Sequence, residues 1–210
     1  MHILRLPIGL LDSNCYLLYD RDGGEAAIVD PGMLDPRDLL QEIANRDLHV
    51  RYVLNTHGHF DHVAGNGLLE VDEADLGIHP ADRELLLQGG GGAHFGLAVA
   101  PSPEPTLDLT DGVTLLLGTA PIEILHTPGH TPGCVCLYLP DEAALLSGDT
   151  LFAGSVGRTD LAGGSHRELE NSLARLLQLP GKTGIYPGHG PATTLDVEKR
   201  RNPWLKGLVS

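Results

Sequence analysis

The sequence predicts an α/β fold in which two β-sheets carry helices on their outer sides, within a single domain. Three observations indicate this class. The 210 residues suit one domain of ordinary size. Strand-like runs outnumber helix-like runs in both halves, and each half ends in a helix-like run. No clear linker interrupts the chain, so we expect residues 1–210 to form one domain.

Short apolar runs bounded by turn residues predict the strands. A turn through Asp22-Gly23-Gly24 joins the second and third of them, and the fourth runs directly into a group of histidines. In chain order the strands are expected at residues 1–6, 14–19, 26–29, 51–54, 113–117, 122–125, 135–139, 144–146 and 184–186.

Apolar stripes and capping residues predict the helices. A stripe of Leu39, Leu40 and Ile43 follows Asp35 and predicts a helix that ends near residue 45. Ser165 and Glu168 have the spacing of a capping box, ahead of a helix that reaches about residue 178. Further helices are expected at residues 62–70, 81–87 and 195–201.

Composition narrows the class of function. The formal net charge of −14 argues against nucleic acid as a partner, because phosphate backbones are bound by clustered Lys and Arg. The apolar N-terminal stretch is broken by Arg5, Pro7 and residues 12–14, so we expect neither a signal peptide nor a membrane span. Three cysteines form no even disulfide framework, and we expect a cytoplasmic protein. Cys134 and Cys136 are expected to pack in the core.

Four consecutive glycines, residues 89–92, give the backbone its greatest freedom. This segment is either a mobile loop or, as a sharper hypothesis, a lid over an active site.

The segment THGHFDH, residues 56–62, concentrates three imidazoles and a carboxylate: His57, His59, Asp61 and His62. Buried together without a partner, these groups would carry a large desolvation penalty. A bound metal cation removes the difficulty, because imidazole nitrogen and carboxylate oxygen are natural metal ligands.

Three more candidate ligands, His130, Asp149 and His189, occur downstream. Each follows a strand-like run and lies in a loop that contains Gly or Pro. Loops at one end of a rigid sheet can bring together ligands from distant parts of a sequence. Five histidines and two aspartates are enough for two metal ions whose coordination is completed by water.

At these positions the chain resembles the metallo-β-lactamase fold family, whose signature is His-x-His-x-Asp-His with later ligands spaced as His130, Asp149 and His189 are here. Two stretches resemble its glyoxalase-II-like branch, the hydroxyacylglutathione hydrolases. They are GDTLFAGSVGRTD, residues 148–160, and PGHGPATTLDVEKRRNPWL, residues 187–205. The sequence ends too soon after His189 for the C-terminal helical domain of full-length glyoxalase II, so we expect that domain to be lacking.

The resemblance implies an αββα sandwich with two divalent metal ions at one edge. It assigns the first metal to His57, His59 and His130, the second to Asp61, His62 and His189, and a bridging role to Asp149. Asp61 and Asp149 are thereby expected to be catalytic as well. Zinc is the expected metal, with iron or manganese as alternatives.

The implied activity is hydrolysis of a small-molecule thioester such as a hydroxyacyl-glutathione, by a hydroxide that bridges the metals. A thiolate leaves readily, so no dedicated general acid is required. Arg158 lies where glyoxalase-II-like enzymes carry a basic residue that contacts the substrate, and it is the predicted substrate-binding residue. Alternatively, Arg158 pairs with Asp160 and only orders its loop.

Two other functions compete with this interpretation. His57, His130 and Asp149 alone would form the two-histidine, one-carboxylate triad of non-haem iron oxygenases, which suggests a persulfide dioxygenase of the same superfamily. A protein that stores or senses metal is the non-enzymatic alternative. β-Lactamase action is disfavoured, because we expect no export signal and no cysteine occupies a ligand position.

Overall fold

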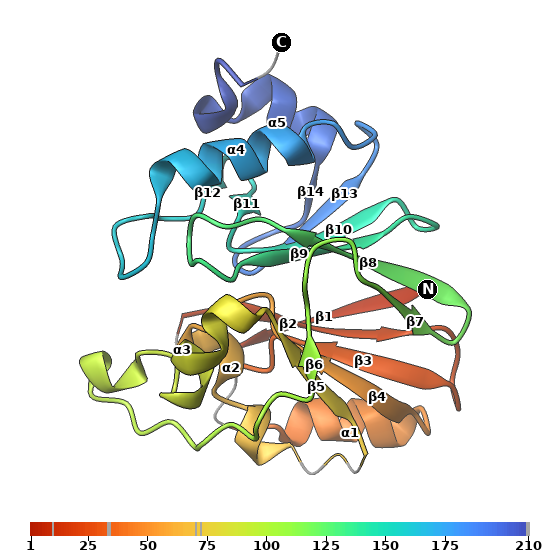
Figure 1. The fold of residues 1–210 in the computed structure, drawn as a ribbon. Coiled ribbons are helices and arrows are strands. Elements are labelled where there is room, and N and C mark those ends of the chain that lie inside the picture. The colour runs from red at the N-terminus through yellow and green to blue at the C-terminus, as the bar shows by residue number, and fades with distance from the viewer. Residues whose placement is uncertain (10, 33–34, 70, 72, 209–210) are drawn as a thin grey trace.

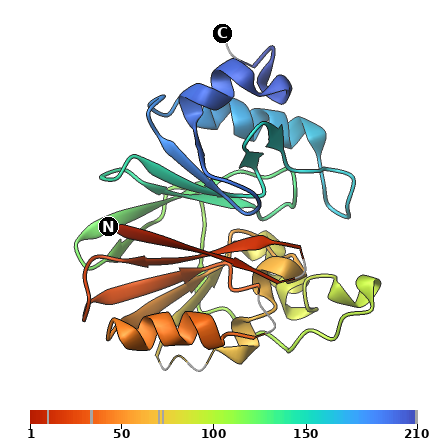
Figure 2. The same ribbon diagram turned by 180° about the vertical axis from the view of Figure 1, so that it is seen from behind.

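The computed structural model describes residues 1–9, 11–32, 35–69, 71 and 73–208. They form four layers in the order helix, sheet, sheet, helix (Figures 1 and 2). The strand order is β1-β2-β3-β4-β5-β6 in one six-stranded sheet and β14-β13-β10-β9-β8-β7 in the other. The predicted αββα sandwich in a single domain is confirmed.

The first half of the chain builds the first sheet. Its β1–β2 and β2–β3 pairs are antiparallel, and the pairs from β3 to β6 are parallel. The strands are β1 His2–Ile8, β2 Ser13–Tyr19, β3 Glu25–Val29, β4 His49–Leu54, β5 Asp75–Ile78 and β6 Leu107–Asp108. The α-helices are α1 Arg37–Asn45, α2 Phe60–Val63 and α3 Arg83–Leu87, and the 3-10 helices are η1 Asn66–Leu68, η2 Pro80–Asp82 and η3 Gly92–Phe95.

The second half builds the second sheet and a small hairpin. All pairs in this sheet are antiparallel except β10–β13, which is parallel. Its strands are β7 Thr114–Leu117, β8 Ala120–His126, β9 Val135–Leu139, β10 Ala144–Gly148, β13 Gly184–Pro187 and β14 Thr193–Thr194, and the hairpin is β11 Leu151–Phe152 with β12 Ser155–Val156. The helices are α4 His166–Leu176, α5 Leu195–Arg201 and the 3-10 helix η4 Pro203–Leu205.

Strand β2 shows how the layers pack, because every one of its side chains is buried. Tyr16 and Leu18 point into the core between the two sheets. Cys15 and Leu17 point to the opposite face, in the same core cluster as Leu39 of α1. Because both faces are buried, residues 15–19 of this strand form a continuous apolar run instead of an alternating one.

Helices α4 and α5 cover the outer face of the second sheet, whereas α1 covers the outer face of the first (Figures 1 and 2). Leu169 and Leu173 of α4 pack with Cys136 and Leu145 of the sheet. Cys134 and Cys136 are both buried free thiols. Cys136 packs in the core between α4 and the second sheet, as predicted from the sequence.

The predicted helix at residues 62–70 is wrong. The α-helix runs only from Phe60 to Val63, and the 3-10 helix Asn66–Leu68 follows it. The main reason is local, because Gly65 and Gly67 weaken a helix. Residue 70 lies outside the described residues. The short strand β5 and the edge strand β6 were not predicted, since four residues and two residues carry too little periodicity.

Other predictions were accurate. Helix α5 spans Leu195–Arg201 as expected, and its N-cap Thr194 accepts a hydrogen bond from the backbone of Val197. Ser165 caps α4 by accepting from the backbone of Glu168. The helix that was expected to reach about residue 178 ends at Leu176.

Two adjacent leucines of β7 test the packing of the sandwich. Leu117 is fully buried in the core between the sheets, whereas Leu116 is 53% exposed. We expect Leu117→Ala to lower the free energy of unfolding by about 2–5 kcal/mol, because it removes buried methyl groups and leaves a cavity. The matched variant Leu116→Ala should change it by less than about 0.5 kcal/mol. Urea denaturation of both proteins measures the difference, and equal losses would contradict the packing described.

Candidate metal centre

All seven predicted ligands lie where the sheets present the carboxyl ends of their strands. Strand β4 ends at Leu54, just before His57, and β10 ends at Gly148, immediately before Asp149. Strand β13 ends two residues before His189. Because β3 is parallel to β4 and β10 to β13, these ends meet along one edge of the sandwich.

The ligand atoms form three overlapping groups, and within each group they lie within 4.8 Å of one another. In the part of the chain that the structure describes, these groups use the seven predicted residues and none of the other histidines. The groups are His57, His59 and His130; His57, His62 and Asp149; and Asp61, His62 and His189. The first and third match the two metal sets expected from the sequence. The assignment of individual ligands to individual ions stays a prediction.

Asp149 lies between those two sets. Its Oδ1 is 3.5 Å from His62 Nε2. Its Oδ2 is 3.6 Å from His130 Nε2 and also 3.6 Å from His189 Nε2. One carboxylate therefore approaches members of both sets, which is the geometry that a bridging ligand requires.

The donor atoms fit a metal because several of them are buried and have no other use. Among the described residues, His57 Nε2, His62 Nε2 and Asp149 Oδ1 are buried and make no hydrogen bond. In the first set, His59 Nδ1 and His130 Nε2 are 2.9 Å apart. Buried polar atoms without partners are rare, and bound metal cations would satisfy them.

Backbone carbonyls fix two of the imidazoles. His130 Nδ1 donates to the carbonyl of Arg158 at 2.8 Å, and His189 Nδ1 donates to that of Leu11 at 3.1 Å. A carbonyl can only accept, so each Nδ1 carries the proton and each Nε2 keeps its lone pair for a metal. Sequence analysis missed both contacts, since the acceptors are main-chain atoms of distant loops and no residue type signals them.

Asp30 supports the ligands from β4 and α2. It follows β3 with a left-handed φ of 54° and is buried. Its carboxylate accepts hydrogen bonds from the Thr56 backbone and hydroxyl, both at 2.7 Å, and from His62 Nδ1 at 3.0 Å. The Thr56 hydroxyl in turn lies 3.2 Å from His57 Nδ1. Asp30 therefore orients one ligand directly and another through Thr56.

The electrostatics of the first set favour neutral imidazoles at His57 and His59. Burial lowers the pKa of His57 well below its usual range, and the nearby His62 and His130 add to the shift. Burial and then His130 lower the pKa of His59 to about 4. Neutral imidazole is the form that binds a metal.

Around His62 the balance is reversed. Burial alone would lower the pKa of this imidazole, but three carboxylates outweigh burial and raise the pKa to about 10. They are Asp149, Asp30 and Asp61. Burial likewise acts to raise the pKa of Asp61, yet His62 and His189 hold it below its usual range. The negative charge of these carboxylates thus favours a positive charge at this point, which either a proton on His62 or a bound metal cation can supply.

The family model of the metallo-β-lactamase superfamily matches residues 8–189. The chain belongs to this superfamily. Hydroxyacylglutathione hydrolase GloC of Haemophilus influenzae is 37% identical over 98% of both chains. The mitochondrial persulfide dioxygenase ETHE1 of Homo sapiens is 34% identical over 90% of this chain and 70% of its own length.

Two solved structures are also similar over nearly the whole fold. The B3 metallo-β-lactamase BLEG-1 has a TM-score of 0.90 and 36% identity, and the match covers 98% of this chain and 100% of that one. TTHA1623, solved in a di-iron-bound form, has a TM-score of 0.87 and 40% identity, with coverage of 96% and 100%. Members of this superfamily that resemble the chain thus differ in their named activities.

Arg158, the predicted substrate-binding residue, lies beside the cluster without entering it. Its exposed guanidinium donates to both carboxylate oxygens of Asp160, at 2.7 and 2.8 Å. It also lines a pocket of about 260 Å³ together with His166 and Trp204. The pairing with Asp160 is the alternative that the sequence left open, and the pocket leaves room for a ligand next to the same side chain.

The glycine segment packs against the ligand loop. The carbonyl of Gly90 accepts a hydrogen bond from the backbone of Phe60 at 2.9 Å. Gly90 has a φ of 64°, and a Cβ there would lie 2.2 Å from the Phe60 nitrogen, so only glycine allows this approach. Phe95, in the 3-10 helix that follows, contacts the Phe60 ring with a centroid distance of 5.3 Å. A lid function stays a prediction.

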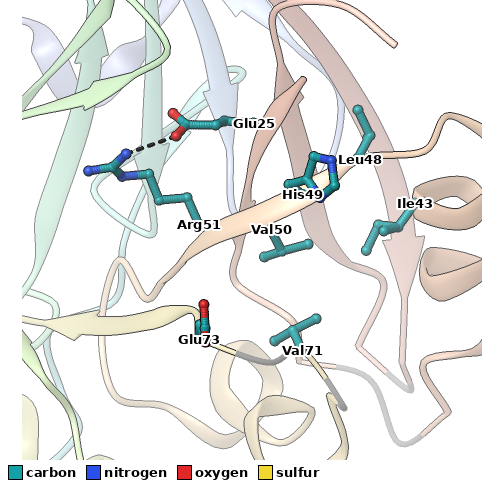
Figure 3. A pocket seen from close by; sticks show the side chains of 8 residues that line it. All are labelled: Glu25, Ile43, Leu48, His49, Val50, Arg51, Val71 and Glu73. Carbon is teal, nitrogen blue, oxygen red and sulfur yellow. Dashed lines mark hydrogen bonds and ion pairs between the residues drawn. The ribbon is translucent and has the colours of Figure 1, made fainter. Parts of the chain in front are cut away.

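A separate pocket of about 420 Å³ opens where β3 and β4 begin (Figure 3). Figure 3 shows the ion pair between Arg51 and Glu25, at 2.8 Å, beside His49 and Val50. None of its lining residues belongs to the three ligand groups. The pocket lies at the opposite end of β4 from His57 and plays no part in the candidate centre.

None of the helices in the part of the chain that the structure describes combines the length and apolar character needed to cross a bilayer.

The position of Asp149 generates a prediction about metal content. Asp149→Asn keeps the shape of the side chain but removes the negative charge between the two sets, so turnover should fall by more than about 100-fold. His189→Ala should instead remove mainly one metal equivalent, because His189 belongs to only one set. Elemental analysis and steady-state kinetics of the purified variants test both statements. Near-normal turnover and metal content in Asp149→Asn would rule out the bridging role.

Proposed function

We propose that the chain is a dinuclear metal-dependent hydrolase of the glyoxalase II type, which cleaves thioesters such as hydroxyacyl-glutathione. The observation that carries this proposal is the pair of ligand sets joined by Asp149. Seven donors exceed what one ion can use, and three of the buried donor atoms have no hydrogen bond among the described residues. Two cations, zinc in the first instance, would satisfy them.

One relative supports a thioester as substrate. GloC of Haemophilus influenzae, named as a hydroxyacylglutathione hydrolase, matches over 98% of both chains, so the similarity extends to every element that carries a ligand. Metal identity is a separate question, because TTHA1623 is a close structural neighbour that holds two irons.

The cluster suits hydrolysis. When bound, two divalent cations supply a water whose pKa is lowered to about 7 and polarise the carbonyl of the substrate. The chain itself holds the donors rigidly, since Asp30 and the carbonyls of Leu11 and Arg158 fix three imidazoles through Nδ1. The leaving group of a thioester is a thiolate, which departs without being protonated. The proposed reaction therefore needs no general acid.

A persulfide dioxygenase is the second candidate, and the human relative ETHE1 favours it. It would use one iron held by His57, His130 and Asp149. Asp61, His62 and His189 would then have no metal to bind, although their ligand atoms lie within 4.8 Å of one another. That third group makes the hydrolase the better-supported function.

Metal stoichiometry and a substrate panel decide between these functions. We expect two metal equivalents per chain and hydrolysis of S-lactoylglutathione, with no oxygen uptake on glutathione persulfide. The panel includes a β-lactam because of the similarity to BLEG-1. One iron with oxygen uptake would instead identify a dioxygenase. At most one metal equivalent after supplementation would exclude the dinuclear centre, and no turnover on any substrate would point to metal storage.

Arg158 offers a test of the thiol carrier. Glutathione carries carboxylates, and an arginine fork can bind one of them with two hydrogen bonds. Arg158→Ala should raise KM for S-lactoylglutathione roughly fivefold, and it should spare kcat and the turnover of a small neutral thioester. Arg83→Ala is the matched control, because Arg83 forms a comparable exposed ion pair with Glu104 at 2.8 Å.

Equal losses on both thioesters would show that Arg158 only orders its loop through Asp160. The proposed contact with the carrier would then be abandoned.

A further inference from the structure

Asp82 is a buried carboxylate that lies outside the ligand groups. It is the last residue of η2, directly before α3, and its side chain is fully buried. Nothing in the sequence around it indicated a role, because it follows no strand-like run and matches no ligand spacing. A buried carboxylate needs compensating hydrogen bonds, and those of Asp82 all come from the loops that carry one set of ligands.

Three donors converge on this carboxylate. Oδ2 accepts from the backbone of Gly58 at 2.9 Å and from the hydroxyl of Thr131 at 2.6 Å. Oδ1 accepts from the backbone of Gly133 at 2.7 Å. A Cβ on Gly133 would lie 2.5 Å from Asp82 Cγ, so glycine is required for this approach.

These contacts bracket the first predicted metal set. Gly58 lies between His57 and His59, and Thr131 directly follows His130. The two segments come from different sheets, since one follows β4 and the other connects β8 to β9. One carboxylate thereby fixes the separation of two loops whose ligands must converge on the same ion.

We propose that Asp82 is a positioning residue for the metal held by His57, His59 and His130. This inference rests on the ligand assignment of the proposed function and adds a residue to it. Asp82 touches neither ligand imidazoles nor metal in this role. It acts by holding the backbone on both sides, so that the three nitrogen atoms remain close enough to share a cation.

The negative charge of Asp82 and its two acceptor oxygens are both needed to hold the two loops in place. A carboxylate can accept all three hydrogen bonds, whereas the amide of Asn has one oxygen and would place its own N–H groups against a donor. Leaving a buried donor unsatisfied is unfavourable and would shift one of the loops. Residues that orient metal ligands typically change metal affinity by about 10–100-fold when replaced.

Glu198 provides a matched control. It is also a buried carboxylate with three donors, and they are the backbone of Gly154, the hydroxyl of Thr193 and the side-chain amide of Asn202. None of these partners belongs to a ligand group. Glu198→Gln therefore reproduces the loss of a buried carboxylate without moving the loops of the first metal set.

The test is a zinc titration of metal-free, full-length protein against a competing chelator, with the wild type, Asp82→Asn and Glu198→Gln in parallel. Asp82→Asn should bind one zinc equivalent about tenfold more weakly and the other within about twofold of the wild type. Glu198→Gln should leave both equivalents unchanged. In a His189→Ala background, the remaining equivalent should be the one that Asp82→Asn weakens.

Thr131→Val keeps the carboxylate and removes only one of its hydrogen bonds, so it serves if Asp82→Asn does not fold. It should weaken the same equivalent to a smaller extent, and unchanged affinity in this variant would overturn the positioning role. Unchanged zinc binding in folded Asp82→Asn, or an equal loss in Glu198→Gln, would overturn it as well. The titration uses no thioester, so inactivity on the substrate panel would refute the proposed hydrolase and leave this result standing.

Discussion

The structure of the candidate metal centre depends on one constraint: the buried nitrogen and oxygen atoms of its ligands must have a partner. His57 and His62 are fully buried, and their Nε2 atoms make no hydrogen bond with the described residues. The surrounding protein fixes each ring through its other nitrogen, by Thr56 and Asp30. Desolvation of such groups is unfavourable unless a cation or proton completes the arrangement.

Much of the fold could be predicted because several of its strands are continuous apolar runs. Residues 15–19 of β2 and residues 135–139 of β9 are buried on both faces of their strands, so each appears as a continuous apolar segment. Helix α5 also has clear ends, since Thr194 caps it and basic residues occupy its last turn. The helix predicted at residues 62–70 was wrong because Gly65 and Gly67 weaken helical structure, and the α-helix ends at Val63.

The site was predictable to the extent that residue type and spacing signal it. His57, His59, Asp61 and His62 form a compact motif, and the three later ligands each follow a strand. The supporting groups were not predictable in the same way. The carbonyls of Leu11 and Arg158 act as main-chain atoms, and Asp82 is related to the ligands only through tertiary contacts. Such roles arise from the folded geometry and leave no pattern along the chain.

Both sheets follow chain order, so every strand pairs with a neighbour in sequence, apart from the hairpin inserted after β10. Each half of the protein thus contains a complete six-stranded sheet of its own. The ligand set is divided between the halves, with four residues from the first and His130, Asp149 and His189 from the second. A metal that binds only the docked halves would add about 2.7 kcal/mol to their association at a hundredfold excess over its Kd. The supply of free metal would then control how firmly the two halves are held together.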